Sequence, residues 1–406
     1  MTRPIYHTFA ILLCGALAGC PAEKATGEAG LVPSAMAHMS DVGAAADGVR
    51  DEPVTRWVSG YYVGYQRDMY RPADIEWRGL THIIMGRIKV RDDATLVTDF
   101  DVDAVNGPAL AREIAARAHK AGRRAILMLG GAGQGAEIRQ SSGPTLRARF
   151  VGNLVKAMAD YGYDGLDLDW EDHLDLDLFL ALVNDLRAAA PHAILTLPAM
   201  PINGNITRSI DPKLVQLANL VDQFNLMSYY PATAYAGGSW RSWHGSALRD
   251  AKGSTPVAIE DSFRRYVAAG VAKRKLGMGI AFYAICYTGG VTAPNQSTLL
   301  GVSIKGGDNE YPLAELFGAK GAFSPAARRW DLTAECAYLS LATPERHGCR
   351  YVSFEDEESI AAKGRFARNN GYGGIIVWTI NQGYVRTRPG GDPNFLMQAL
   401  GKAFIQ

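Results

Sequence analysis

Residues 163–171 read Tyr-Asp-Gly-Leu-Asp-Leu-Asp-Trp-Glu, an alternation of apolar and acidic side chains. Because successive side chains of a β-strand point to opposite faces, we expect Asp167, Asp169 and Glu171 on one face and the leucines and tryptophan on the other. Residues 164–177 contain seven acids and no lysine or arginine, so nothing local neutralises these carboxylates. Crowded carboxylates must shift their pKa values or share protons, which is typical of a catalytic strand.

The apolar face of this stretch favours a strand buried on its far side over the alternative, a solvated acidic loop. A glutamate at the end of such a strand, among other acids, can keep its proton near neutral pH and act as a general acid. We therefore expect Glu171 to be a catalytic acid. Asp169, two residues earlier on the same face, would orient a reacting group or accept a proton.

The sequence Asp-Gly-Leu-Asp-Leu-Asp-Trp-Glu at 164–171 resembles the signature of the family 18 glycoside hydrolases, the chitinase family. The resemblance implies that the substrate's own 2-acetamido carbonyl oxygen is the nucleophile, an exception to the usual carboxylate-pair mechanism of glycosidases. It also implies that Glu171 is the acid and then the base, that Asp169 orients the acetamido group, and that Asp167 shares a proton with Asp169. No metal and no cofactor is implied.

Short apolar runs alternate with amphipathic segments from Trp57 onward, the pattern of a parallel sheet with crossover helices. Eight strands are predicted at 57–63, 81–88, 125–129, 164–170, 193–198, 223–229, 276–282 and 374–379, and the clearest helices at 108–120, 145–161, 175–189 and 259–269. Eight repeats predict a (β/α)8 TIM barrel, in which Glu171 would lie at the carboxyl end of the fourth strand, where sites of this fold occur. A doubly wound open sheet is the alternative, but residues 130–135 lack the final glycine of a nucleotide fingerprint.

The stretch of about 287–352 is too long for a routine connection. It predicts a small α+β insertion between strands seven and eight, similar to the insertion that walls the cleft of many chitinases; a long surface loop is the alternative. It contains two of the three cysteines that follow the N-terminal segment, Cys336 and Cys349, and we expect these two to form a disulfide, with Cys286 left as a buried thiol. No cysteine pair has metal-ligand spacing.

Other strand ends carry side chains suited to a site. Gln223, Asn225, Met227 and Tyr229 would share one face of the sixth strand, and residues 226–230 resemble a Met-x-Tyr-Asp element of the family. The resemblance implies that the Tyr229 hydroxyl binds the acetamido group and that Met227 and Tyr230 contact substrate. Tyr230 replaces the aspartate of that element. A core tyrosine is the alternative for Tyr229.

Aromatic side chains are expected around the same end of the barrel. Trp378 resembles the tryptophan that lies under the sugar at the cleavage subsite, because apolar pyranose faces suit aromatic platforms; a buried core tryptophan is the alternative. Tyr61 resembles a site tyrosine of strand one, and Tyr283 follows strand seven. Met128 replaces a serine that supports the innermost aspartate in the family, so we expect a raised pKa for Asp167.

A loop after the sixth strand contains Tyr235, Trp240 and Trp243. Exposed aromatics there would extend a sugar-binding groove, so Trp240 and Trp243 are predicted substrate contacts; a packed loop cluster is the alternative. The isolated histidines His173 and His244 are expected to be structural rather than ligands.

The N-terminus predicts export. Arg3, an apolar run at 9–17 and the sequence Leu-Ala-Gly-Cys at 17–20 have the regions of a signal peptide, and the last four residues resemble a bacterial lipobox. This makes Cys20 the lipidated first residue of an outer-membrane or cell-surface lipoprotein, with plain secretion as the alternative. Residues 21–52 are expected to be a flexible tether, and 53–406 the catalytic domain.

Length and charge narrow the function. With 406 residues, 48% of them hydrophobic, the chain can bury a large core, and a net charge of +1 disfavours nucleic acid or acidic membranes as partners. We expect a monomeric chitinase of β-1,4-linked N-acetylglucosamine polymers, held to a bilayer only by its lipid. The alternatives are an endo-β-N-acetylglucosaminidase acting on glycans or peptidoglycan, and a catalytically inactive chitin-binding lectin.

Overall fold

The computed structural model describes residues 56–229, 240–299 and 301–406. Several expectations concern residues outside these ranges and remain predictions, namely the leader 1–20 with Cys20, the tether 21–52, Tyr230 and Tyr235.

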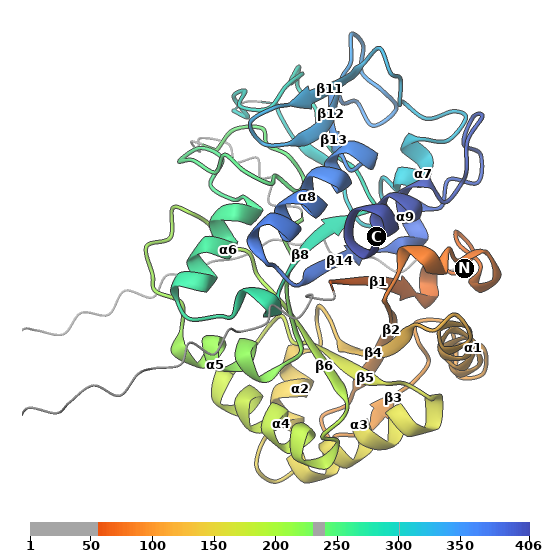
Figure 1. The fold of residues 1–406 in the computed structure, drawn as a ribbon, viewed down its shortest axis with the longest axis vertical. Coiled ribbons are helices and arrows are strands. Elements are labelled where there is room, and N and C mark those ends of the chain that lie inside the picture. Colours follow the sequence, from red (N-terminus) through yellow and green to blue (C-terminus); the bar gives the residue numbers. More distant parts are fainter. Residues whose placement is uncertain (1–55, 230–239, 300) are drawn as a thin grey trace, which may run out of the picture. The chain divides into compact units, whose positions relative to one another are not determined.

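Eight parallel strands form a closed barrel (Figure 1). They are β1 (Trp57–Val63), β2 (His82–Val90), β4 (Arg124–Gly130), β5 (Gly165–Asp169), β6 (Ile194–Ala199), β7 (Gln223–Leu226), β8 (Leu276–Ala281) and β14 (Gly374–Trp378). Each strand pairs with the next, and β1 pairs with both β2 and β14, so the sheet has no open edge among these eight. A short β3 (Leu96–Val97) adds antiparallel to β2. The predicted TIM barrel is confirmed.

Helices alternate with the strands and surround the barrel. They are α1 (Asn106–Lys120), α2 (Gly135–Ser141), α3 (Arg147–Tyr161), α4 (Leu176–Ala189), α5 (Pro212–Leu220), α6 (Ile259–Ala268), α7 (Leu313–Leu316), α8 (Glu357–Asn370) and α9 (Phe395–Leu400). Single turns of 3-10 helix occur at Gly64–Gln66, Pro72–Asp74, Trp77–Gly79, Lys273–Lys275 and Ile380–Gly383, and a π-helical turn at Gly401–Ile405. Within the described part of the chain, no helix combines the length and apolarity needed to cross a bilayer.

Local sequence sets the helix ends. The side chain of Asp175 accepts hydrogen bonds from the backbone N–H groups of the first turn of α4, and Asp356 starts α8 with a reciprocal capping box. The helices α3 and α8 each end at a glycine in the left-handed region, Gly162 and Gly371, which only a residue without Cβ adopts without strain.

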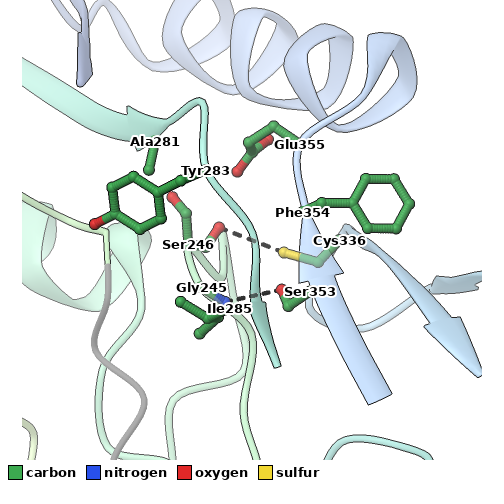
Figure 2. Close-up of a pocket in the computed structure, with 9 residues that line it drawn as sticks. All are labelled: Gly245, Ser246, Ala281, Tyr283, Ile285, Cys336, Ser353, Phe354 and Glu355. Atoms are coloured by element: carbon green, nitrogen blue, oxygen red, sulfur yellow. Dashed lines mark hydrogen bonds between the residues drawn. The ribbon is translucent and has the colours of Figure 1, made fainter. Parts of the chain in front are cut away.

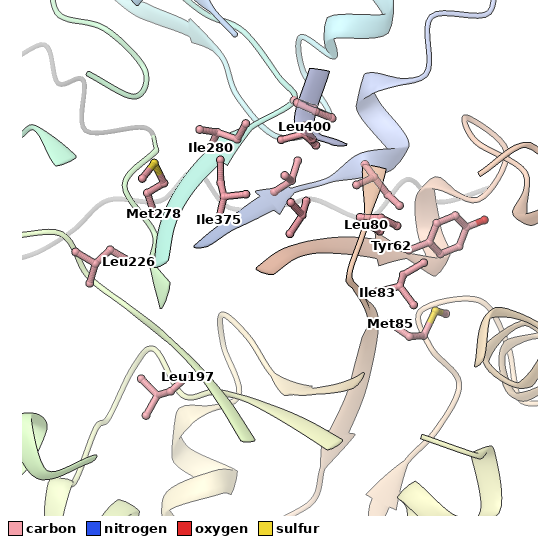
Figure 3. Close-up of a cluster of buried hydrophobic side chains, with 14 of the residues drawn as sticks. Tyr62, Leu80, Ile83, Met85, Leu197, Leu226, Met278, Ile280, Ile375 and Leu400 are labelled. Carbon is pink, nitrogen blue, oxygen red and sulfur yellow. The ribbon is translucent and has the colours of Figure 1, made fainter. Parts of the chain in front are cut away.

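The period-two alternation of the strands divides the buried residues between two layers. Outward side chains such as Ile83, Met85, Leu166 and Leu197 belong to the large core between barrel and helices, part of which Figure 3 shows. Inward side chains form a smaller cluster inside the barrel, made of Tyr61, Ile84, Ile126, Met128 and Ile376, with Ile194, Tyr229 and Trp378 packed against it. The inner layer is therefore apolar at this level of the barrel, while Ser59, Gln223 and Asn225 bring polar groups into another part of the interior.

The chain between β8 and β14 builds a second sheet. Its five antiparallel strands are β9 (Ile285–Tyr287), β10 (Ile304–Gly306), β11 (Arg328–Asp331), β12 (Cys336–Ser340) and β13 (Tyr351–Phe354), in the order β10-β9-β13-β12-β11. The four-residue helix α7 is the one α-helix of the described chain between β9 and β13. The predicted insertion of about 287–352 thus extends a few residues further at each end and is mostly β.

The expected disulfide between Cys336 and Cys349 is wrong. Cys349 is bonded to Cys286, with a Cα–Cα distance of 5.8 Å, and Cys336 is a buried free thiol. The strand register gives the reason: Ala337 pairs with Phe354 while Ser340 pairs with Tyr351, so Cys336 and Cys349 lie at opposite ends of the β12–β13 hairpin. The thiol of Cys336 instead contacts the carbonyl of Ser246, as Figure 2 shows.

Candidate active site

The three predicted acids come together at the carboxyl end of β5. Asp167 and Asp169 point to the barrel interior and are 0% and 4% exposed, and Glu171 is half-buried two residues past the strand end. Trp170 turns the other way: its ring packs on Phe179 and its indole N–H donates to a backbone carbonyl. The alternation of side-chain direction predicted from the sequence therefore continues past the strand, and Glu171 lies on the same side as the two aspartates.

Two hydroxyl groups hold Asp167. The Tyr61 hydroxyl donates to Oδ2 at 2.9 Å, and the Thr196 hydroxyl donates to Oδ1 at 2.5 Å. Burial raises the pKa of Asp167 to about 6, the two hydroxyl groups oppose that rise, and the charge of Glu171 adds to it. The raised pKa expected for Asp167 agrees with this environment.

Asp169 lies in a less favourable place for a negative charge. Burial, and then the charges of Glu171 and Asp167, raise the pKa of Asp169 well above its usual range. Its Oδ1 has no hydrogen-bond partner among the described residues, while its side chain hydrogen-bonds Glu171. That bond raises the pKa of Asp169 and lowers that of Glu171, which is the sign expected when Asp169 carries the proton and donates it.

Glu171 is suited to proton transfer. Burial raises its pKa most, the negative charge of Asp172 adds to the rise, and the bonds from Asp169 and from the Ala132 backbone limit it. The turn after β4 lies close to the acids because Gly131 has no side chain. Its φ of 81° suits glycine, and a Cβ at this position would lie 2.9 Å from Met128 Cε and 3.5 Å from Asp169 Oδ2. The carboxyl group is thus protonated to a higher pH than a free glutamic acid.

Arg87 brings a positive charge to the same place from β2. Its Nη1 donates to the carbonyls of Gly130 and Ala132 at 2.9 and 3.3 Å, and its Nε donates to Asp101 at 3.1 Å. The guanidinium lowers the pKa of both Asp169 and Glu171. We did not predict this residue; the signal for it is an arginine within the apolar run of residues 83–88.

Aromatic rings line the space beside the acids. Tyr61 and Trp378 have ring centroids 5.1 Å apart, and Tyr229 meets Tyr283 edge to face at 6.5 Å. Trp378 remains partly exposed at the end of β14. The acid cluster therefore faces rings from four strands or strand ends, β1, β7, β8 and β14.

A carboxylate from the insertion holds the Trp378 ring. Asp308 accepts hydrogen bonds from the side chains of Trp378 and Gln66, from the Tyr65 hydroxyl at 3.1 Å and from Gln382 at 2.8 Å. Burial raises the pKa of Asp308, and these four donors oppose the rise. The insertion thus reaches the barrel end that carries the acids.

Residues 58–383 match the family model described as glycosyl hydrolases family 18. The chain belongs to this family. It is 25% identical to chitinase A1 of Niallia circulans over 272 residues and 25% identical to an endochitinase of Manduca sexta over 356 residues. These alignments cover 58% and 77% of this chain, but only 37% and 61% of the two relatives.

Solved chitinase structures share the fold. A group IV chitinase of Ostrinia furnacalis superimposes with a TM-score of 0.69 at 22% identity, covering 86% of this chain and all of that chain. A class V chitinase of tobacco superimposes with a TM-score of 0.65 at 17% identity over the same share of this chain. At this identity the likeness concerns the barrel and its insertion, and activity has to be argued from the residues.

The remaining predicted contacts of this family 18 chain differ in their placement. Met227 and Trp240 are half-buried, and Tyr230 lies outside the described residues. Trp243 is 2% exposed, its indole N–H donates to the Val257 carbonyl at 2.9 Å, and it packs in a cluster of small apolar residues. The substrate contact predicted for Trp243 is wrong, because a buried ring has no free face for a sugar.

Three buried polar side chains, two on β7 and one in the chain after it, have structural partners. Gln223 accepts from Ser59 and Asn225 accepts from the Trp57 indole, at 2.8 and 3.0 Å, so these inward side chains of β7 satisfy other interior groups below the acids. His244 is buried between Asp331 and the Tyr351 hydroxyl, in keeping with its expected structural role. Their polarity is explained by internal pairing.

Proposed function

We propose that this family 18 protein is a chitinase that hydrolyses β-1,4-linked N-acetylglucosamine chains by substrate-assisted catalysis with retention of configuration. The observation that carries the proposal is the buried acid cluster, in which the pKa of Asp169 is raised well above its usual range beside Glu171 while Asp167 is bonded by two hydroxyl groups. The names of the relatives, chitinase A1 and endochitinase, support the substrate class.

In the first step Glu171 gives its proton to the glycosidic oxygen. The C1–O bond breaks as the acetamido carbonyl oxygen of the same sugar bonds to C1, which gives a cyclic oxazolinium ion and the freed chain end. Asp169 orients the acetamido N–H. The Tyr229 hydroxyl, close to Asp169 and Glu171 in the buried site, binds the acetamido oxygen.

In the second step Glu171, now a carboxylate, takes a proton from water. The oxygen of that water bonds to C1 and the C1–O bond of the oxazolinium ring breaks, which restores the acetamido group and regenerates the acid. Two inversions at C1 give net retention. Trp378 supplies the aromatic platform under the sugar, because its ring stays partly exposed beside the acids.

Ligand-bound structures of the same fold support this assignment. A structure of the Ostrinia furnacalis enzyme is a complex with allosamidin, and structures of tobacco and Cycas revoluta class V chitinases hold NAG4 and (GlcNAc)3. A barrel that covers 86% of this chain therefore accommodates such ligands in those proteins.

The test compares wild type with Glu171→Gln on chitotetraose and on a high-mannose glycopeptide, with Glu113→Gln, an exposed glutamate of α1, as the matched control. We expect wild type and Glu113→Gln to release short chito-oligomers whose first-formed anomer is β, and Glu171→Gln to release none. Cleavage of the glycopeptide alone would assign the endo-β-N-acetylglucosaminidase reaction instead. Binding of chitotetraose without product from wild type would make the protein a lectin.

A further inference from the structure

Asp172, the residue directly after Glu171, binds the turn that follows β4. Its Oδ1 accepts a hydrogen bond from the backbone N–H of Gly135 at 2.6 Å, and its Oδ2 accepts one from the backbone N–H of Gly133 at 3.2 Å. Hydrogen bonds that a carboxylate accepts are stronger than those between neutral groups. One side chain therefore joins the end of β5 to the turn after β4.

The two segments fit closely around this contact. A Cβ at Gly135 would lie 1.8 Å from the carbonyl oxygen of Asp172, so a larger residue would not fit without a shift of the backbone. That carbonyl oxygen also accepts from the Trp170 indole N–H at 2.9 Å, and the next residue, His173, has a φ of 48°. A residue with a side chain keeps such a left-handed conformation only where the surrounding structure holds it. The chain after Glu171 is therefore fixed from both sides.

The same turn also donates to the acid. The backbone N–H of Ala132, one residue before Gly133, hydrogen-bonds Glu171. No lysine or arginine among the described residues forms an ion pair with Asp172, whose carboxylate is bonded by backbone N–H groups instead. We propose that Asp172 is a positioning residue for the proton donor: it fixes the turn after β4 against Glu171 and keeps a second negative charge beside it.

This charge acts on Glu171 in both steps of the proposed reaction. It disfavours the Glu171 carboxylate, so the acid keeps its proton to a higher pH in the first step, and the carboxylate is a stronger base in the second. Burial raises the pKa of Glu171 most, and the negative charge of Asp172 raises it further. The hydrogen bond from Ala132 has the opposite effect.

Other charged or titratable groups surround the acid and Asp172. They are Asp167 and Asp169 from β5, Arg87 from β2, Tyr229 after β7, and Glu137 and Arg139 from α2. Among them, Arg87 lowers the pKa of Glu171. The charges of Arg87 and Asp172 therefore oppose each other at the acid.

Because the inference rests on the proposed function, the experiment has two readouts that need no activity. Asp172→Asn keeps the shape and one acceptor but removes the charge, and Asp172→Ser, which also removes the charge, replaces it if thermal unfolding shows that Asp172→Asn does not fold. Asp177→Asn is the matched control, because it removes an exposed charge of α4 that pairs with Lys213. Each protein is titrated by carboxyl NMR of Glu171, its Gly133 and Gly135 amides are followed by hydrogen exchange, and kcat/KM on chitotetraose is measured across pH.

In Asp172→Asn we expect the Glu171 pKa to fall by about half a unit to one unit, because a neighbouring negative charge, partly screened by solvent, is lost. The alkaline limb of kcat/KM should move to lower pH by the same amount. At least one of the two glycine amides should exchange about tenfold faster, because asparagine offers one acceptor oxygen where aspartate offers two. Asp177→Asn should behave as wild type, and the double variant Arg87→Gln with Asp172→Asn should have its alkaline limb near that of wild type.

The outcomes separate the two claims. If wild type cleaves chitotetraose and the alkaline limb of Asp172→Asn does not move to lower pH, the role of Asp172 is refuted while the chitinase assignment stands. If wild type cleaves none, the chitinase assignment fails and the NMR titration decides: an equal or higher Glu171 pKa in the variant refutes the role of Asp172, and a lower one supports it. Wild-type exchange rates at both glycine amides in the variant would also refute it.

Discussion

Replacing Arg87 should change the pH dependence of the enzyme through the acid Glu171. The Nη1 of Arg87 and the Oδ2 of Asp169 lie 3.2 and 3.5 Å from the position that a Cβ would take at Gly131, so these two atoms are at most about 7 Å apart. With one proton between them, Asp169 and Glu171 carry a single negative charge, and at an effective dielectric of about 20 Arg87 attracts a unit charge at about that distance by about 2 kcal/mol. Because Asp101 also neutralises Arg87, whose side chain is 26% exposed, we reduce this to about 1 kcal/mol.

Arg87→Gln removes a cation that lowers the pKa of Glu171 and Asp169, so both pKa values should rise. Glu171 must be protonated for the first step and is therefore active below its pKa. The alkaline limb of kcat/KM on chitotetraose should then move to higher pH by about 0.7 unit. The measurement is a set of kcat/KM values from about pH 4 to pH 9 at constant ionic strength.

Arg87→Lys is the matched control, because it keeps the charge but lacks the planar guanidinium, whose Nη1 donates to the Gly130 and Ala132 carbonyls while its Nε donates to Asp101. Its alkaline limb should stay close to that of wild type. The electrostatic reasoning is refuted if the limb of Arg87→Gln does not move, or if Arg87→Lys moves it as far.

Three other changes have clear expected results. Trp378→Ala should lower kcat/KM on chitotetraose by about tenfold or more, because the stacking face for the sugar is lost. Trp243→Phe should lower the melting temperature and leave kcat/KM nearly unchanged, because this ring is buried. The reverse pattern would contradict the placement of these two rings. Non-reducing peptide mapping should find Cys286 linked to Cys349, and Cys286→Ser should reduce the free energy of unfolding by about 2–5 kcal/mol; a Cys336–Cys349 peptide would overturn the pairing. In a bacterial host the wild-type protein should incorporate labelled palmitate and sediment with membranes, and the Cys20→Ser variant should do neither. If the wild-type protein and the variant are released from the cells equally, the predicted lipid anchor at Cys20 is wrong.

Much of the fold could be predicted because it depends on patterns within single segments. The strand at 57–63 follows from a short apolar run, as do the starts of the other barrel strands to within one residue. The acid positions follow from the period-two alternation after Tyr163. The seventh barrel segment shows the limit. We expected a strand at 223–229, but β7 ends at Leu226. Beyond it, the hydroxyl group of Ser228 hydrogen-bonds the backbone N–H and carbonyl of Gly279 on the neighbouring strand β8.

What could not be predicted depends on which strands lie side by side. Thr196 contacts Asp167 because β5 and β6 pair in one register, and Cys349 bonds Cys286 because β9 pairs with β13. Neither strand pairing can be predicted from the sequence of a single segment. Trp240 and Trp243 illustrate the same point for loops: they are three residues apart, yet one is half-buried at the surface and the other is enclosed. Burial of a loop residue depends on what packs over it.

The most direct test of the central claim is whether hydrolysis needs the substrate's acetamido group. Wild-type protein should be assayed on chitotetraose and on cellotetraose, which has the same β-1,4 linkage with hydroxyl groups at C2. We expect cleavage of chitotetraose, with Glu171→Gln inactive, and no measurable cleavage of cellotetraose. Equal kcat/KM values on the two substrates would contradict it, because Glu171 would then act without the neighbouring carbonyl oxygen.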